Sequence, residues 1–211
     1  MDSEKPRTAA TVFDALGADY EQAFAGSAAH RASLESLLER LAPGSRVLDI
    51  GSGTGRPTAQ TLTDAGHEVL GVDVSPVMVD LASRQVPAAE FRCADVRELP
   101  LEEASFDAVC VYFSLLQLSR AEQGDVLRRA ARALRPGGHL AVATVPLDVE
   151  GVNGTFMGQP VQVSSFGEDA FAELVAEAGF TVLARESNLF VPDHPAAVPE
   201  PHLFVLARLR S

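Results

Sequence analysis

Three glycines at alternate positions, Gly51, Gly53 and Gly55, directly follow an apolar stretch that runs from 46 to 50. A stretch with helical spacing comes next and ends at Gly66. A buried strand, a glycine turn and a helix in this order are typical of the first unit of a nucleotide-binding sheet. Glycines permit the tight turn and let a ligand contact the backbone, whose free N–H groups at the helix start face that ligand. The pattern therefore predicts a nucleotide-like ligand at this loop.

Carboxylates end the next two apolar stretches of the chain. Asp73 comes 22 residues after Gly51 (73 − 51) and closes the predicted strand 68–72. An acidic residue at about this distance accepts hydrogen bonds from ribose hydroxyls in nucleotide-binding sheets. Asp95 has the corresponding place after 90–94. Either carboxylate could also serve only its own turn or helix cap, but the glycine loop upstream favours a ligand contact for Asp73.

The spacing of the glycines separates two kinds of nucleotide site. A dinucleotide fingerprint would have its third glycine at position 56, where this chain has Arg56, and the third glycine is instead Gly55. The Gly-x-Gly-x-Gly pattern, with Asp49 before it in the strand, resembles the first motif of the class I, Rossmann-like S-adenosylmethionine-dependent methyltransferases. The segment Leu-Arg-Pro-Gly-Gly-His-Leu at 134–140 also resembles a segment of this family. The resemblance covers roughly positions 46 to 146.

The resemblance implies that S-adenosyl-L-methionine is the cofactor. It implies that Asp49 supports the glycine loop, that the loop contacts the methionine part, and that Asp73 binds the ribose. Asp95 and Val96 would bind the adenine, with the carboxylate accepting from its exocyclic amine. The implied cofactor-binding residues are Asp49, Gly51, Ser52, Gly53, Asp73, Val74, Met78, Asp95, Val96 and Tyr112.

Predicted strands and helices alternate along the chain, and this order is typical of a mostly parallel sheet. We expect a single α/β methyltransferase domain over 1–211, with a doubly wound seven-stranded sheet, helices on both faces and an antiparallel last strand. Residues 1–42 would form an N-terminal helical lid or cap, and 43–211 the Rossmann-like core. Helical periodicity leaves a second interpretation of the first segment open, in which its helices simply pack on one edge of the sheet.

The C-terminal third is expected to complete the ligand edge of the sheet. Residues 146–164 contain three glycines and are predicted to form a long connection. Ser165 and Glu168 have the spacing of a capping box for the helix that follows. The final strands are expected at 180–185 and 202–208, joined by a proline-rich loop. If the last strand is antiparallel, this loop lies at the ligand edge.

Few acid–base groups are needed for methyl transfer from a sulfonium donor. The acceptor must be held in line with the methyl–sulfur bond, and such positioning supplies about 7–11 kcal/mol. A hydroxyl acceptor also needs a base near its proton. The candidate catalytic residues at the ligand edge are His30, His194 and Tyr20, with His202 and Asp148 as further candidates. Each of these five could instead be structural.

An N-terminal lid is predicted from aromatic residues on one helical face, Phe13, Tyr20 and Phe24. In the resembled family a similar N-terminal stretch commonly folds over the cofactor. We therefore expect residues 1–27 to form a mobile lid, with Tyr20 facing the sulfonium side of the cofactor. The glycine-rich segment 151–158 would form the opposite wall.

The composition restricts the partners of this chain. The formal net charge is −12 and Lys5 is the sole lysine, so the surface repels phosphate backbones and anionic membranes. Cys93 and Cys110 lie in predicted buried strands and are expected to be reduced core residues, and the sequence has no cluster of metal ligands. The sequence has no apolar run of membrane-spanning length, and its polar N-terminal residues are not expected to be a secretory signal. We expect a cytoplasmic monomer or homodimer that binds neither nucleic acid nor membrane.

Together these features predict S-adenosylmethionine-dependent methyl transfer to an oxygen, nitrogen or carbon of a small, largely apolar acceptor of the secondary-metabolite kind. Relatives often carry a histidine in a Leu-His-x-Leu run after the fourth strand, where this chain has Gln117. One alternative is a protein that binds S-adenosylmethionine without methylating. Another is a nucleotide-dependent oxidoreductase, which the displaced third glycine disfavours.

Overall fold

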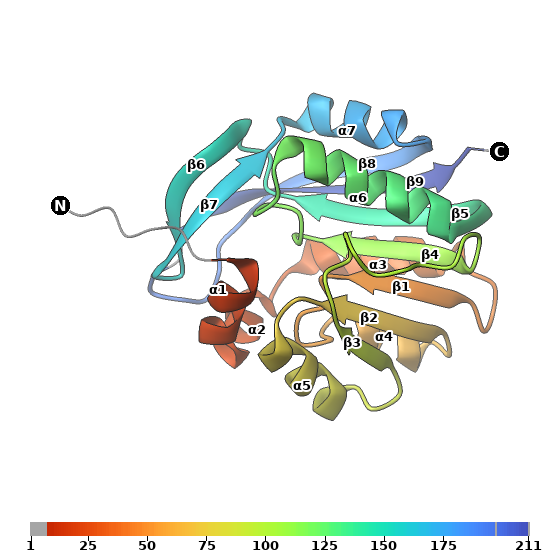
Figure 1. Cartoon of the computed structure of the whole chain (residues 1–211), viewed down its shortest axis with the longest axis horizontal. Helices are drawn as coiled ribbons and strands as arrows, with labels where there is room; N and C mark the ends of the chain where they lie inside the picture. Colours follow the sequence, from red (N-terminus) through yellow and green to blue (C-terminus); the bar gives the residue numbers. More distant parts are fainter. Residues whose placement is uncertain (1–7, 197, 211) are drawn as a thin grey trace.

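A seven-stranded sheet in the order β3-β2-β1-β4-β5-β9-β8 forms the centre of the computed structural model, which describes residues 8–196 and 198–210 (Figure 1). Strands β1 to β5 run parallel, and β9 is antiparallel to both β5 and β8. The strands are β1 (Arg46–Ile50), β2 (Glu68–Asp73), β3 (Glu90–Cys93), β4 (Phe106–Tyr112), β5 (Leu134–Thr144), β8 (Phe180–Phe190) and β9 (Glu200–Leu209). The predicted fold class, including the antiparallel last strand, is confirmed.

Helices cover both faces of the sheet, which explains why its central strands are apolar throughout. Val47 of β1 packs with α3 (Ala28–Leu38) and α4 (Thr58–Asp64) on one face. Leu48 and Ile50 point to the other face, where α6 (Arg120–Ala133) and α7 (Glu168–Glu177) lie (Figure 1). Helix α5 (Pro76–Gln85) packs beside β2 and β3. Within the described residues, no helix combines the length and apolarity needed to cross a membrane.

Two short helices and a β-hairpin lie beyond the carboxyl ends of the parallel strands (Figure 1). The helices are α1 (Ala9–Leu16) and α2 (Ala18–Phe24), and Gly17 separates them with a φ of +50°. The hairpin consists of β6 (Val149–Phe156) and β7 (Gln159–Ser165). The two units share an apolar cluster that is separate from the sheet core, formed by Val12, Leu16, Ala23, Met157 and Val161.

Residues 146–164 were expected to be a long connection, and this expectation is wrong because most of them form the hairpin. Its turn is made by Met157 and Gly158, both with positive φ. The prediction of a capping box formed by Ser165 and Glu168 is also wrong. Gly167 is the N-cap of α7, and the Ser165 hydroxyl instead donates to the Val145 carbonyl and accepts from the Leu147 N–H. These two bonds connect the hairpin to the residues that follow β5.

The C-terminal strands are longer than the sequence indicated, since β8 extends to Phe190 and β9 begins at Glu200. The prediction that both cysteines are buried is half wrong. Cys110 is buried in the central strand β4, whereas Cys93 is exposed because β3 is an edge strand. Both thiols are free.

Candidate active site

The glycine loop after β1 has two glycines with different physical reasons for being glycine. Gly51 has a φ of +71°, and a Cβ atom there would lie 2.1 Å from the Cβ atom of Ser114. Ser114 cannot retreat easily, because its hydroxyl donates to the Ile50 carbonyl at 2.8 Å. Gly53 has a φ of +51°, but a Cβ there would meet no atom within 4 Å. The protein fold requires Gly51, whereas Gly53 leaves open space on a cavity wall.

Asp73, at the end of β2, anchors this loop. Its side chain accepts hydrogen bonds from the N–H groups of Gly53 and Ser75, both at 2.9 Å. Asp73 is 8% exposed, and burial raises the pKa of its carboxyl in spite of these bonds. The Val74 N–H also acts on this carboxyl. A carboxylate has about four acceptor positions, so capacity remains for a ligand hydroxyl. This geometry fits the predicted contact with a ribose.

Asp49 lies beneath the loop and has an unusual environment for a carboxyl group. It is 2% exposed, and its Oδ2 atom has no partner among the described residues. Burial, followed by the nearby charge of Asp73, raises the pKa of Asp49 to about 7. A pair of buried carboxylates favours a cation nearby. The open cradle at Gly53 and these two carboxylates therefore fit S-adenosylmethionine, whose sulfonium and amino groups are positive.

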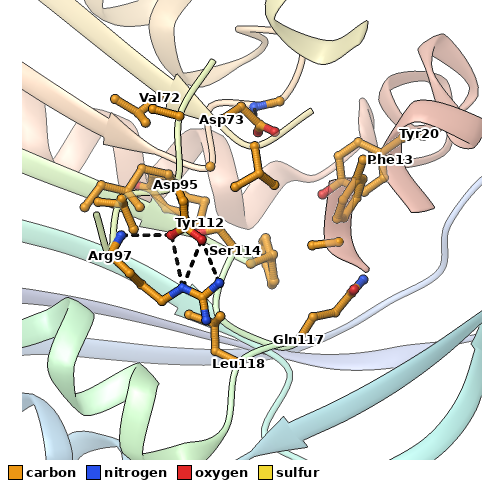
Figure 2. Close-up of a pocket in the computed structure, with 18 residues that line it drawn as sticks. Phe13, Tyr20, Val72, Asp73, Asp95, Arg97, Tyr112, Ser114, Gln117 and Leu118 are labelled. Atoms are coloured by element: carbon orange, nitrogen blue, oxygen red, sulfur yellow. Dashed lines mark hydrogen bonds and ion pairs between the residues drawn. The ribbon is translucent and has the colours of Figure 1, made fainter. Parts of the chain in front are cut away.

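A cavity of about 130 Å³ has the glycine loop in its wall, and Figure 2 shows the residues that line it. Of the residues predicted to bind the cofactor, its wall contains Gly51, Gly53, Asp73, Val74, Asp95, Val96 and Tyr112. Asp49, Ser52 and Met78 are buried and do not belong to the wall. The cavity brings most of the predicted residues together, and their individual roles stay predictions.

Asp95 is engaged by a residue that sequence reasoning missed. Arg97 donates to both carboxylate oxygens through its side chain, at distances between 2.6 and 3.1 Å, and its N–H donates to Oδ1 (Figure 2). These bonds hold the pKa of Asp95 below its usual range. Arg97 also pairs with Glu122 of α6. An adenine amine at this place would therefore meet a carboxylate that is already ion-paired.

A second, larger cavity of about 370 Å³ adjoins the first. Its walls are mostly apolar, and the hairpin contributes Val152, Thr155, Phe156, Val161 and Val163 to them. The two cavities share the wall residues Ala9, Phe13, Tyr20, Phe113, Ser114 and Gln117. A ligand on the glycine loop and a ligand in the apolar cavity would thus be neighbours.

The three predicted catalytic residues are not gathered at one place. Tyr20 lines both cavities, and burial, with smaller contributions from Glu200 and Asp73, raises the pKa of its hydroxyl. His30 packs on the Tyr112 ring at 4.1 Å between centroids, and burial lowers its pKa to about 3. His194 accepts from the Ala196 N–H at 3.1 Å. Neither histidine lines either of the two cavities described above.

The first prediction separates the two glycines. Replacing Gly53 by Val should abolish S-adenosylhomocysteine binding by calorimetry, because the side chain occupies ligand space, while the strained φ costs about 1–2 kcal/mol of stability. Replacing Gly51 by Val should lower the melting temperature far more, owing to Ser114. Gly44→Val is the matched control, since Gly44 also has a φ of +71° and open space but lies outside both cavities. Unchanged affinity in Gly53→Val would contradict the site.

The second prediction follows from the raised pKa of Asp49. The unfolded chain releases this proton near the ordinary pKa of 3.8, whereas the folded state keeps it up to about pH 7, so stability is lost as pH rises through that window. The melting temperature of the ligand-free protein should therefore fall more between pH 5 and pH 8 than that of Asp49→Asn. Equal slopes for the two proteins would show that Asp49 titrates normally.

Comparisons with known proteins agree with this geometry. Residues 47–138 match the family model described as a methyltransferase domain. The chain is 42% identical over 113 residues to a demethylmenaquinone methyltransferase from Beutenbergia cavernae, covering 54% of this chain and 45% of that protein. It is 37% identical over 150 residues to the 27-O-demethylrifamycin SV methyltransferase of Amycolatopsis mediterranei, covering 68% and 49%. The chain thus spans about half the length of these curated relatives.

One solved structure is similar over nearly the whole chain. It is the 1,6-didemethyltoxoflavin-N1-methyltransferase of Burkholderia thailandensis, with bound 1,6-didemethyltoxoflavin and S-adenosylhomocysteine. The TM-score is 0.73 at 27% sequence identity, and the match covers 99% of this chain and 93% of that one. The glycine loop, the carboxylate at the end of β2 and the sheet order indicate the same family as these comparisons. The chain belongs to the class I, Rossmann-like S-adenosylmethionine-dependent methyltransferases.

Proposed function

We propose that this protein transfers the methyl group of S-adenosylmethionine to an oxygen, nitrogen or carbon atom of a small, largely apolar acceptor. The observation that carries the proposal is the shared wall between the cavity at the glycine loop and the apolar cavity beside it. Methyl transfer requires donor and acceptor to be held in contact and in line. Adjoining cavities with Phe13 and Tyr20 in both walls meet that requirement.

Positioning is the main catalytic device in this proposal. When bound, the cofactor supplies an activated methyl group on a sulfonium. The backbone of Gly51 and Gly53 would hold the methionine part, and Asp73 the ribose. The aromatic wall of the second cavity excludes water from the reacting atoms, and a dry site strengthens every electrostatic interaction within it. These residues bind, orient and desolvate, as the reaction needs.

The apolar cavity also supports the acceptor class. Its walls are built mainly from valine, leucine, proline and phenylalanine side chains, which favour an apolar body. The curated relatives are named for demethylmenaquinone and for 27-O-demethylrifamycin SV, both small molecules compared with a protein or nucleic acid. The net charge of −12 further disfavours nucleic acids as acceptors.

We also propose that α1 and α2 act as the lid over the site. Their aromatic side chains meet the hairpin, with Tyr20 at 6.3 Å and Phe24 at 6.0 Å from the ring of Phe156. Polar contacts join both helices to the rest of the chain. Glu21 accepts from the Gln85 amide at 3.0 Å and lies 3.9 Å from Arg56, and Asp14 accepts from the Val77 N–H at 3.4 Å. The Ser75 hydroxyl donates to Asp14 at 2.6 Å, and the Asp193 N–H donates to the Ala23 carbonyl at 2.9 Å. The buried residues of the two helices pack in the separate cluster with the hairpin, so the segment can open without exposing the sheet core.

Direct titration tests the proposed function. The purified protein should bind S-adenosylhomocysteine and not NAD, because Arg56 replaces the third glycine of a dinucleotide site. An acceptor panel of apolar hydroxyl, amine and activated carbon compounds, assayed for methyl release, should then yield at least one methylated product. Preference for NAD would overturn the proposal. Tight S-adenosylhomocysteine binding with no product from any acceptor would favour a protein that binds the cofactor without methylating.

Truncation tests the lid. A protein that begins at Ser27 keeps α3 with its N-cap residue and removes α1 and α2, whose buried residues pack in the separate cluster with the hairpin. It should still fold and bind S-adenosylhomocysteine, whereas methyl transfer should fall much further than cofactor affinity, because the site stays open to water. A melting temperature many degrees lower without cofactor would show that α1 and α2 are structural helices and not a lid.

A further inference from the structure

The apolar cavity has one charged residue. Among the described residues that line it, Glu200 at the start of β9 is alone in carrying a charge at neutral pH. Its side chain is 20% exposed. Placing a carboxylate against apolar walls costs free energy unless a partner offsets the lost hydration. We therefore expect the Glu200 carboxylate to have a hydrogen-bond donor on the protein and a second donor on the ligand.

The protein supplies the first partner. His202 donates from Nε2 to Glu200 Oε1 at 2.8 Å, since an ionised carboxylate can only accept. His202 is 1% exposed and packs against the rings of Phe113 at 4.4 Å and Phe190 at 5.1 Å. Its Nδ1 atom is buried without a partner in the described residues. The imidazole thus fixes one carboxylate oxygen, and no described residue bonds the other oxygen.

Tyr20 relates Glu200 to the methyl donor site. Burial raises the pKa of the Tyr20 hydroxyl most, and the charges of Glu200 and Asp73 raise it further. Asp73 belongs to the cofactor cavity and Glu200 to the apolar cavity, and Tyr20 lines both. Glu200 therefore stands on the acceptor side of the tyrosine that borders the cofactor. Tyr20 itself stays protonated and is a donor, not a base.

We infer that Glu200 is the catalytic residue that binds and deprotonates the acceptor, and that the acceptor is an aromatic compound with a phenolic or enolic hydroxyl. This inference rests on the proposed function and names its substrate class. The aromatic residues of the wall, among them Phe13, Phe24, Phe113 and Phe156, suit a flat ring. A carboxylate is a weak base, so the hydroxyl must be an acidic one for efficient proton transfer.

The step balances in atoms and charge. The acceptor oxygen uses a lone pair to bond the methyl carbon as the methyl–sulfur bond breaks, and the bonding electrons remain on sulfur. The hydroxyl proton passes to the free oxygen of Glu200, while His202 holds the other oxygen. The sulfonium loses its positive charge and Glu200 loses its negative charge, which is favourable in a site of low dielectric constant.

Three matched probes test this recognition in the presence of S-adenosylhomocysteine. 1-Naphthol has the hydroxyl, 1-methoxynaphthalene lacks its proton, and 1-naphthoate carries an anion. The wild-type protein should bind 1-naphthol about tenfold more tightly than 1-methoxynaphthalene, as expected for a hydrogen bond to a charged group, and should reject 1-naphthoate. In Glu200→Gln the preference for 1-naphthol should shrink several-fold and binding of 1-naphthoate should improve.

Glu186→Gln is the control. Glu186 is an exposed residue of the neighbouring strand β8, and its substitution removes the same charge outside the cavity. It should bind all three probes as the wild type does. With S-adenosylmethionine, the wild type should convert 1-naphthol to 1-methoxynaphthalene, and Glu200→Gln should reduce turnover on the order of 10² with unchanged cofactor affinity. The glutamine can still accept from His202, so both variants should melt as the wild type does.

The outcomes separate this inference from the proposed function. If the wild type binds S-adenosylhomocysteine but does not prefer 1-naphthol or does not methylate it, the role of Glu200 is overturned and methyl transfer to another acceptor still stands. The same holds if Glu200→Gln retains the wild-type preference and turnover. If the wild type does not bind S-adenosylhomocysteine, the proposed function itself fails.

Discussion

The carboxylate of Asp73 is the constraint on which the site depends. It accepts from the N–H of Gly53 in the loop after β1 and from the N–H of Ser75 before α5, and so fixes two loops with one side chain. Val72 in the same strand accepts from the N–H groups of Gly51 and Ser52. The glycine loop is therefore held by β2, and its open side faces the cavity.

The second half of the site is built by segments outside the parallel strands. The hairpin β6–β7, helices α1 and α2, and the loop before β9 all lie at the edge where β1 to β4 end, and they enclose the apolar cavity. Within the described residues, its one charge, Glu200, is held by the buried His202. In the proposed function, the sheet supplies the cofactor site and these added segments supply the acceptor site.

Sequence spacing was enough to predict that the loop glycines and Asp73 lie at one cavity. The loop glycines and Asp73 are local features whose positions follow from strand, turn and helix order, and the structure places them together. The acceptor side depends on contacts that local patterns do not encode. His30 belongs to a helix expected at the site, but the rotation of that helix turns its ring onto Tyr112. The glycines of the hairpin indicated a loop, and the exposure of Cys93 depends on a strand order that spacing cannot give.

A structure of the protein with S-adenosylhomocysteine would show directly whether the two cavities meet at the reacting atom. We expect the ribose to lie at Asp73 and the sulfur to lie at the shared wall, next to Phe13 and Tyr20, facing the apolar cavity. A sulfur atom that faces away from the apolar cavity, or a ligand bound outside the glycine loop, would contradict this expectation.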